Sequence, residues 1–202
     1  AGNKVMLSVN AAGTSSTSGL SQALPALSGD GRFVAFGEQG GPTDLTSTSA
    51  TVCPAVPVTG SSPNQVYVRD RDVDGNGVFD EPNTKPGTSF DKTVTCLASI
   101  DNSGPVPGTG LPGTGLSAPS EPISISADGR IISFFTEATN LIGQALPAGV
   151  LEEGVARDTC FGLAPAGCTP FTFVTTQTTA APPALANKMS NAGIIARPPR
   201  IS

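Results

Sequence analysis

The chain has 202 residues, including 24 glycines, 19 prolines and no histidine, and its formal net charge at pH 7 is −5. Glycine and proline at this density disfavour long helices, and no run approaches the ~18 apolar residues of a membrane-spanning helix. Lysine and arginine form no cluster. Because phosphate contacts need such side chains, the acidic balance argues against nucleic acid as a partner.

The apolar segments are short, rich in Val, Ile, Phe and Thr, and bounded by Gly, Pro, Ser and Asp. This pattern is typical of an all-β protein with many short strands. In chain order, a Val-rich segment at Val5 to Val9 precedes two units of four predicted strands. The first unit comprises Leu24 to Leu27, Arg32 to Phe36, Gln65 to Arg69 and Val94 to Ala98. The second comprises Pro122 to Ile125, Arg130 to Phe135, Gly154 to Cys160 and Phe171 to Thr175.

A nine-residue phrase occurs once in each unit: residues 28–36 read SGDGRFVAF and residues 126–134 read SADGRIISF. Asp-Gly between two apolar runs is a strong hairpin signal. In each copy the aspartate is expected to cap its own turn and the glycine to supply positive φ. The next residue, Arg32 or Arg130, is expected to pair with that aspartate or to cover the edge of the sheet.

The succession S-x-D-G-R-[FI]-[VI]-[AS]-F, T-[DN]-L, V-Y-V-R-D and a Val-rich strand resembles the WD40-like, TolB-type β-propeller repeats of secreted bacterial proteins. The resemblance covers nearly the whole chain. It implies an all-β fold of propeller-like blades, each with four antiparallel strands, in a single region over 1–202. Blade one would span about 20–99 and blade two about 117–176, with the start of a third at 197–202.

A closed propeller typically has four to eight blades, so about two blades predict a structure that is incomplete or open within this chain. Three arrangements are compatible with this expectation: a fragment of a longer chain, pairing between chains, or an open two-sheet β domain.

Residues 70–81 read DRDVDGNGVFDE and fit the calcium-loop pattern D-x-[DN]-x-[DN]-G-x5-E. One register starts at Asp70 and ends at Glu81. A second starts at Asp72 and includes the Val78 carbonyl. Together the two registers nominate Asp70, Asp72, Asp74, Asn76, Val78, Asp80 and Glu81 as calcium ligands. Closely spaced carboxylates repel one another unless a cation is bound, and the alternative is a solvated acidic loop without metal. Flanking helices are not expected, because a strand precedes the loop.

The four cysteines are Cys53, Cys96, Cys160 and Cys168, and none forms a C-x-x-C pair. Cys160 and Cys168 flank a turn-forming segment, which predicts a short loop closed by a disulfide. Cys53 and Cys96 are the pair left over, and four buried free thiols are the alternative. An even cysteine count, few lysines and Ser/Thr-rich loops indicate an oxidising setting, either extracellular, periplasmic or at the cell surface.

Without histidine, Ser-His-Asp and Cys-His catalysis and mixed Cys/His zinc sites are excluded. Phosphate-binding glycine patterns are absent. Four glutamates leave a carboxylate pair for glycoside hydrolysis as a minor alternative: Glu121, Glu137, Glu152 and Glu153. We therefore expect no enzyme.

The sequence instead favours an extracellular, calcium-stabilised β-propeller-type scaffold or binding module. The end segments Val5 to Val9 and Arg197 to Ser202 would be free to pair with neighbouring subunits, because an exposed strand edge is a template for another chain. A protein partner or self-assembly into an oligomer or filament is thus expected. The alternative is a non-catalytic propeller part of a larger secreted hydrolase.

Overall fold

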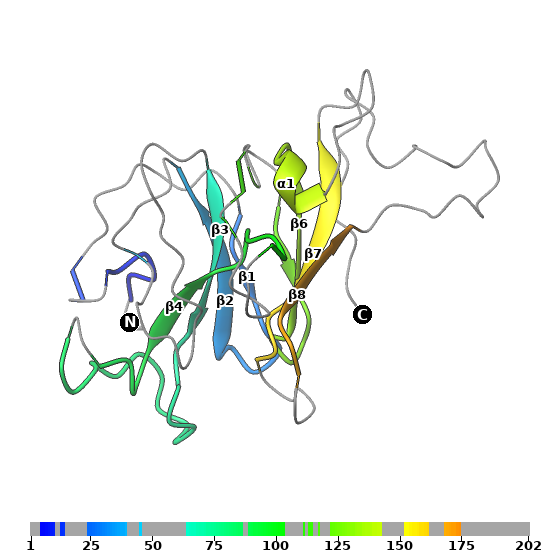
Figure 1. The fold of residues 1–202 in the computed structure, drawn as a ribbon. Helices are drawn as coiled ribbons and strands as arrows, with labels where there is room; N and C mark the ends of the chain where they lie inside the picture. Colours follow the sequence, from blue (N-terminus) through cyan, green and yellow to red (C-terminus); the bar gives the residue numbers. More distant parts are fainter. Residues whose placement is uncertain are drawn as a thin grey trace.

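The computed structural model of the chain describes residues 5–10, 13–14, 24–39, 45, 64–86, 89–103, 111, 113–114, 117, 122–142, 152–161 and 168–174. Within these ranges, eight strands form two antiparallel sheets of four strands each (Figure 1). The first sheet contains β1 (Ala26–Leu27), β2 (Phe33–Glu38), β3 (Gln65–Asp70) and β4 (Val94–Leu97). The second contains β5 (Ser124–Ile125), β6 (Ile131–Thr136), β7 (Glu153–Asp158) and β8 (Phe171–Val174). A one-turn helix, α1 (Thr139–Ile142), follows β6.

Each sheet is a meander in which strands that follow one another in the sequence are neighbours in space. The predicted all-β class and the two units of four antiparallel strands are therefore confirmed. The described strands form two open sheets, and none of them closes a barrel. The sheets lie within the ranges predicted for blades one and two, while 197–202 lies outside the described residues.

Two strand predictions differ from the structure in detail. The third strand of the second unit was expected over 154–160, but β7 begins at Glu153 and ends at Asp158. The Val-rich segment at the start of the chain is not one of the eight strands. Residues 5–10 contain a single isolated bridge position at Val9, and this segment lies beside the first sheet (Figure 1).

The repeated phrase forms the β1–β2 and β5–β6 hairpins, as predicted. Gly31 and Gly129 both have φ of +77°, a left-handed conformation that favours glycine because it has no Cβ. In each hairpin the serine that opens the phrase closes the turn with its backbone. Ser28 N–H donates to the Phe33 carbonyl at 2.9 Å, and the second copy has the same bond.

The two sheets pack on each other through alternate residues, which form one hydrophobic core. The first sheet contributes Phe33, Ala35, Val66, Val68, Val94 and Cys96 to this core, and the second contributes Ile132, Phe134 and Val155. Successive residues of a strand point to opposite faces. The repeat aligns Phe33 with Ile131, yet the second sheet faces the first through the next residue, Ile132. The sheets therefore stack in the same sense, with one face of the first against the opposite face of the second.

The outer faces of both sheets are also covered. On the first, Phe36, Tyr67 and Leu97 form a smaller core with Leu45 and Ile100. On the second, the most buried outer-face residues are at most 2% exposed: Ser133, Phe135 and Ala156.

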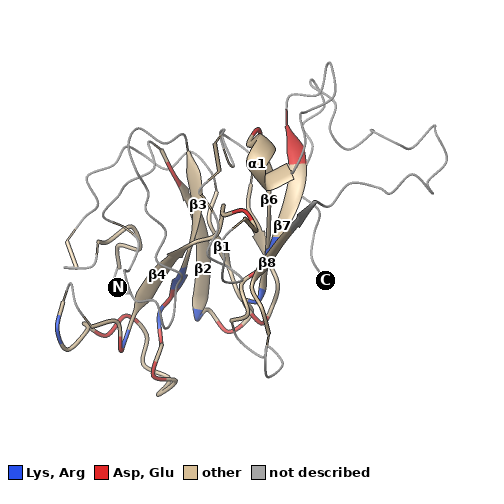
Figure 2. Cartoon of the chain, in the orientation of Figure 1, with Lys and Arg blue, Asp and Glu red and all other residues tan. Residues whose placement is uncertain are grey.

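Most of the charged residues coloured in Figure 2 lie at the lower ends of the strands, near the Asp-Gly turns and the Asp-rich loop. The strand bodies between them are mostly uncharged. Among the residues that the structure describes, no helix has the length and apolar character needed to cross a membrane.

Candidate functional site

Each sheet holds a matching arginine–aspartate pair at the end of its third strand. Arg32 Nε and Nη2 donate to Asp70 Oδ1 and Oδ2, both at 2.8 Å. In the second sheet Arg130 Nη2 donates to Asp158 Oδ2 at 2.6 Å. These arginines thus reach the neighbouring strand, whereas the sequence suggested the turn aspartate or the sheet edge. Paired fork geometry of this kind is specific, and its repetition in both sheets indicates a structural role.

The turn aspartates act as predicted. Asp30 Oδ1 accepts a hydrogen bond from Ser28 Oγ at 2.6 Å and from the Arg32 backbone N–H at 3.0 Å. The Ser28 hydroxyl is the main cause that lowers the pKa of Asp30. Asp128 has the equivalent contacts with Ser126 and the Arg130 N–H, and its pKa is also lowered, chiefly by the Ser126 hydroxyl.

The Asp-rich loop over 70–81 connects β3 towards β4, and its first carboxylate is already engaged. Asp70 is 4% exposed, and its two oxygens accept from Arg32. Its Oδ1 also accepts from the Asp72 backbone N–H at 3.0 Å. In the register that starts at Asp70, both oxygens of the first proposed ligand are therefore hydrogen-bonded to the Arg32 guanidinium.

Asp72 organises the turn of the loop. It is 5% exposed, and its Oδ1 accepts from the Asn76 N–H at 3.0 Å. Its Oδ2 accepts from the Gly77 N–H at 2.9 Å. Gly75 and Gly77 have φ of +68° and +83°, so each of the two registers has a glycine with positive φ at its sharp turn.

Two carboxylates of the loop converge on one ammonium group. Lys92 Nζ lies 2.5 Å from Asp74 Oδ2 and 3.7 Å from Glu81 Oε2. Asn76 Nδ2 donates to the same two oxygens at 3.0 and 2.8 Å. The hydrogen bond that Lys92 donates to Asp74 lowers the pKa of Asp74 and raises the pKa of Lys92. Val78 follows this cluster, and its N–H donates to Asn76 Oδ1 at 2.8 Å.

Asp80 is directed to arginines. Its Oδ2 accepts from Arg71 Nε at 2.9 Å and Nη2 at 2.5 Å. Its Oδ1 faces Arg69 Nε at 3.8 Å. In the described part of the chain, no three carboxylates of the loop bring ligand atoms together as a metal cluster. Four of the predicted calcium ligands form salt bridges with arginine or lysine: Asp70, Asp74, Asp80 and Glu81.

The predicted disulfide between Cys160 and Cys168 is confirmed, with a Cα–Cα distance of 5.7 Å. Cys96 is also disulfide-bonded, and its predicted partner Cys53 lies outside the described residues. Asp158 lies beside the first disulfide, where its Oδ1 accepts from the Cys160 N–H at 3.0 Å. The two sulfurs and a carboxylate oxygen of Asp158 lie within 4.8 Å of one another, close enough for three ligands of one metal ion. However, sulfurs bonded to each other offer no thiolate to a metal.

The glutamates nominated for glycoside hydrolysis differ in environment. Glu121 lies outside the described residues, and Glu137 is exposed. Glu153 is 7% exposed, and burial raises the pKa of its carboxyl.

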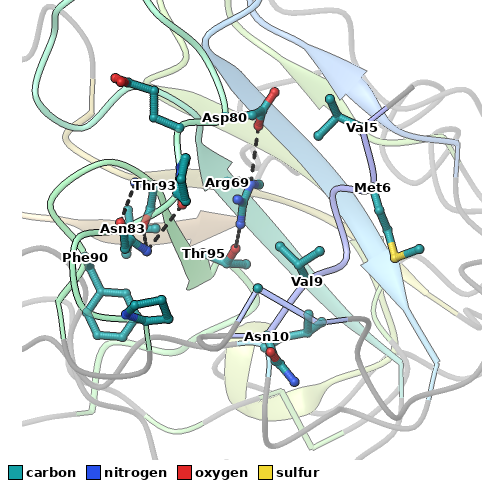
Figure 3. A pocket seen from close by; sticks show the side chains of 16 residues that line it. Val5, Met6, Val9, Asn10, Arg69, Asp80, Asn83, Phe90, Thr93 and Thr95 are labelled. Carbon is teal, nitrogen blue, oxygen red and sulfur yellow. Dashed lines mark hydrogen bonds and ion pairs between the residues drawn. The ribbon is translucent and has the colours of Figure 1, made fainter. Parts of the chain in front are cut away.

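A cavity of about 390 Å³ lies on the outer face of the first sheet, lined in part by Arg69 and Asp80 (Figure 3). The sequence does not predict this cavity: its pattern nominates Asp80 as a calcium ligand only and gives Arg69 no role. The one available signal was the Arg-Asp step at the end of the third strand in both units, which marks a buried arginine in each sheet.

Comparison with protein-family models, with curated proteins and with solved structures gives no match. What the chain does must therefore be inferred from its own geometry. The Cys160–Cys168 disulfide indicates an oxidising environment.

Proposed function

We propose that the protein is an extracellular or periplasmic, non-enzymatic scaffold or binding module of the β-propeller type, stabilised by calcium at the Asp-rich loop. The observation that carries this proposal is the same-sense stacking of the two sheets through one shared core. A head-to-tail contact of this kind can be repeated from unit to unit, and it produces a ring if the rotation closes. Blades of a propeller are arranged in that way.

The residual charge of the loop supports a divalent cation. Three arginines gather at the two ends of the loop, where Arg32 pairs with Asp70 and both Arg69 and Arg71 pair with Asp80. In the middle, Asp72, Asp74 and Glu81 have one ammonium group near them, that of Lys92. This group of three carboxylates and one lysine has a local net charge of −2, which Ca²⁺ would balance. The residues that would hold the ion are Asp72, Asp74, Asn76, Glu81 and the Val78 carbonyl, all oxygen donors of the kind calcium prefers. Asp70 and Asp80 fit less well because their oxygens face arginines.

A bound ion would stabilise more than the loop. Arg71 Nη1 donates to the Gly31 carbonyl at 2.7 Å, and its guanidinium lies 4.9 Å from the centre of the Phe79 ring. The loop is thus in contact with the hairpin turn of the first sheet through Arg71. Holding the loop in place would hold that turn, so calcium would act on the stability of the sheet.

The test is thermal unfolding with calcium and with a chelator. At a calcium concentration of about 100 Kd, binding adds about 2.7 kcal/mol of stability, which raises Tm by about 5–10 °C in a chain of this size. Asp74→Asn removes a proposed ligand and should abolish most of the calcium-dependent rise. Asp91→Asn is the matched control: Asp91 is another loop aspartate, bonded to Ser89 and Thr84. It should keep the full rise. Equal Tm values with calcium and with chelator in the unmodified chain would refute the calcium part of the proposal.

Assembly would use an edge strand of a described sheet, and β4 is our candidate, since a sheet edge can accept a further strand. At β8, by contrast, the backbone N–H and carbonyl of Thr172 are already bonded to the side chain of Asn102. Residues 5–10 lie against the first sheet and line the cavity, so an edge strand is the better candidate than that segment, and 197–202 lies outside the described residues. Native mass spectrometry measures this directly. A multiple of the 20.2 kDa chain mass is expected, and a stable monomer at micromolar concentration would contradict assembly.

A further inference from the structure

The Asp-rich loop contains an asparagine followed by a glycine. Asn76-Gly77 is the only Asn-Gly step in the chain. Because glycine has no Cβ, its backbone nitrogen can approach the preceding side chain closely. Attack of this nitrogen on the side-chain carbonyl carbon forms a succinimide ring and releases ammonia, and water then opens the ring to aspartate or isoaspartate. This step is therefore the place in the chain where deamidation meets the least steric resistance.

The backbone nitrogen of Gly77 faces a carboxylate that is held in place. Gly77 N–H donates to Asp72 Oδ2 at 2.9 Å. The other oxygen of Asp72 accepts from the Asn76 N–H at 3.0 Å, and the residue is buried. The amide must lose its proton in order to attack, and a positioned carboxylate can take that proton as a general base.

Two contacts of the Asn76 side chain match the other needs of the reaction. Its Oδ1, which gains negative charge during the attack, accepts from the Val78 N–H at 2.8 Å. A donor directed at a developing oxyanion lowers the barrier. Its Nδ2, which leaves as ammonia, donates to Asp74 Oδ2 at 3.0 Å, and Lys92 Nζ lies 2.5 Å from the same oxygen. An ammonium proton donor is thus next to the leaving nitrogen.

Two other asparagines have amide groups that bridge backbone groups. Asn83 bonds both the N–H and the carbonyl of Thr93 through its Oδ1 and Nδ2. Asn102 bonds the N–H and the carbonyl of Thr172 in the same way. Each is followed by a residue with a side chain. They serve as internal references, because their amides are held by the fold without a glycine beside them.

We propose that Asn76 is a deamidation site whose conversion the folded loop accelerates. Asp72 takes the proton of the Gly77 N–H, and that nitrogen forms a bond to Asn76 Cγ. The bond between Cγ and Nδ2 breaks, and Nδ2 leaves as ammonia with a proton from Lys92. Water opens the ring, and the two side chains regain their starting forms by proton exchange with water. Overall, one amide and one water give one carboxylic acid and one ammonia.

The product changes the charge of the loop. A carboxylate at position 76 joins those of Asp72, Asp74 and Glu81, and the two hydrogen bonds that Asn76 Nδ2 donates are lost. Four carboxylates and the ammonium of Lys92 then give a local net charge of −3 in place of −2. Because like charges repel, the converted loop is less stable without a cation. The conversion itself does not depend on calcium.

The experiment compares the full chain folded in buffer with the same chain unfolded in urea, both at neutral pH with a chelator. Peptide mapping by mass spectrometry follows the replacement of NH₂ by OH at each asparagine over time. Asn76 should convert about tenfold faster in the folded chain than in urea, because positioned acids and bases act only there. Asn83 and Asn102 should convert more slowly in the folded chain. A rate at Asn76 that is no higher in the folded chain than in urea would overturn the proposal.

Variants assign the acceleration to individual groups. Asp72→Asn removes the base and should lower the rate in the folded chain about tenfold, while the rate in urea stays the same. Asp91→Asn, the matched change at a carboxylate bonded to Ser89 and Thr84, should leave both rates unchanged. Lys92→Met alters a side chain that is 24% exposed, so it is compatible with folding, and it should slow the conversion severalfold. An undiminished rate in both folded Asp72→Asn and folded Lys92→Met would contradict the proposed roles.

Discussion

Replacing Gly129 with alanine tests the contact that joins the two sheets. A Cβ on Gly129 would lie 2.1 Å from Cδ2 and 2.5 Å from Cγ of Phe33. Phe33 is 1% exposed and begins β2 of the first sheet, so its ring has little room to withdraw. Gly31 is the matched control: it has the same φ of +77°, but the nearest atom to its added Cβ is Phe79 Cε2 at 3.7 Å.

The two substitutions share one penalty and differ in the other. Placing alanine at positive φ costs about 1–2 kcal/mol in both hairpins. Only Gly129→Ala adds a clash with a buried ring, and overpacking of a core costs about 1–3 kcal/mol more. We expect Gly129→Ala to lower the free energy of unfolding by about 2–5 kcal/mol and Gly31→Ala by about 1–2 kcal/mol.

Urea denaturation of the full chain measures both values. Phe33→Leu in the Gly129→Ala background provides a second readout, because a smaller side chain relieves the clash. The double variant should be less destabilised than the sum of the single changes, a coupling that double-mutant cycles detect between residues in contact. Two results together would refute the contact between the second hairpin turn and Phe33. One is that Gly129→Ala and Gly31→Ala lower the free energy of unfolding equally. The other is that the effects of Gly129→Ala and Phe33→Leu on that free energy are additive in the double variant.

Three further predictions concern individual groups. Glu153→Gln should raise Tm at pH 7, because burial raises the pKa of Glu153 and its ionised form therefore costs stability above the unfolded pKa. The gain should fade as the pH falls below about 4, and a gain independent of pH would contradict this cause. Replacing Cys160 and Cys168 with serine opens a loop with a sequence separation of 8 and should cost about 2–3 kcal/mol in guanidinium denaturation; unchanged stability would argue against a structural disulfide. Ser126→Ala removes the hydroxyl that lowers the pKa of Asp128, a group that contributes stability above its unfolded pKa and loses it as the pH falls through its folded pKa. The carboxyl of Asp128, followed by NMR, should titrate at higher pH in this variant, and an unchanged titration would assign the lowered pKa to another group.

Features that depend on residues close together in the chain can be predicted from the amino-acid sequence. The Asp-Gly phrase predicts both hairpins, because a capping aspartate and a glycine with positive φ act within one turn. The short segments rich in Val, Ile, Phe and Thr predict the strands, and the repeat predicts that four of them form one unit. Cys160 and Cys168 are close enough in sequence for their disulfide to be predicted from a turn between them.

Contacts between side chains that are far apart in the sequence are visible only in the folded chain. Arg32 and Asp70 are far apart in the sequence, and only the pairing of β2 with β3 places the guanidinium on that carboxylate. The same applies to the Asp-rich loop, where a pattern of carboxylates could not reveal that two of them face arginines.

The stacking of the sheets and the cavity over Arg69 depend on packing as well. The two units have nearly the same phrase, yet Arg157 is covered by the first sheet and Arg69 lies on the floor of a cavity. Local sequence cannot distinguish these two arginines, because their difference is produced by what packs above each strand and not by the strand itself.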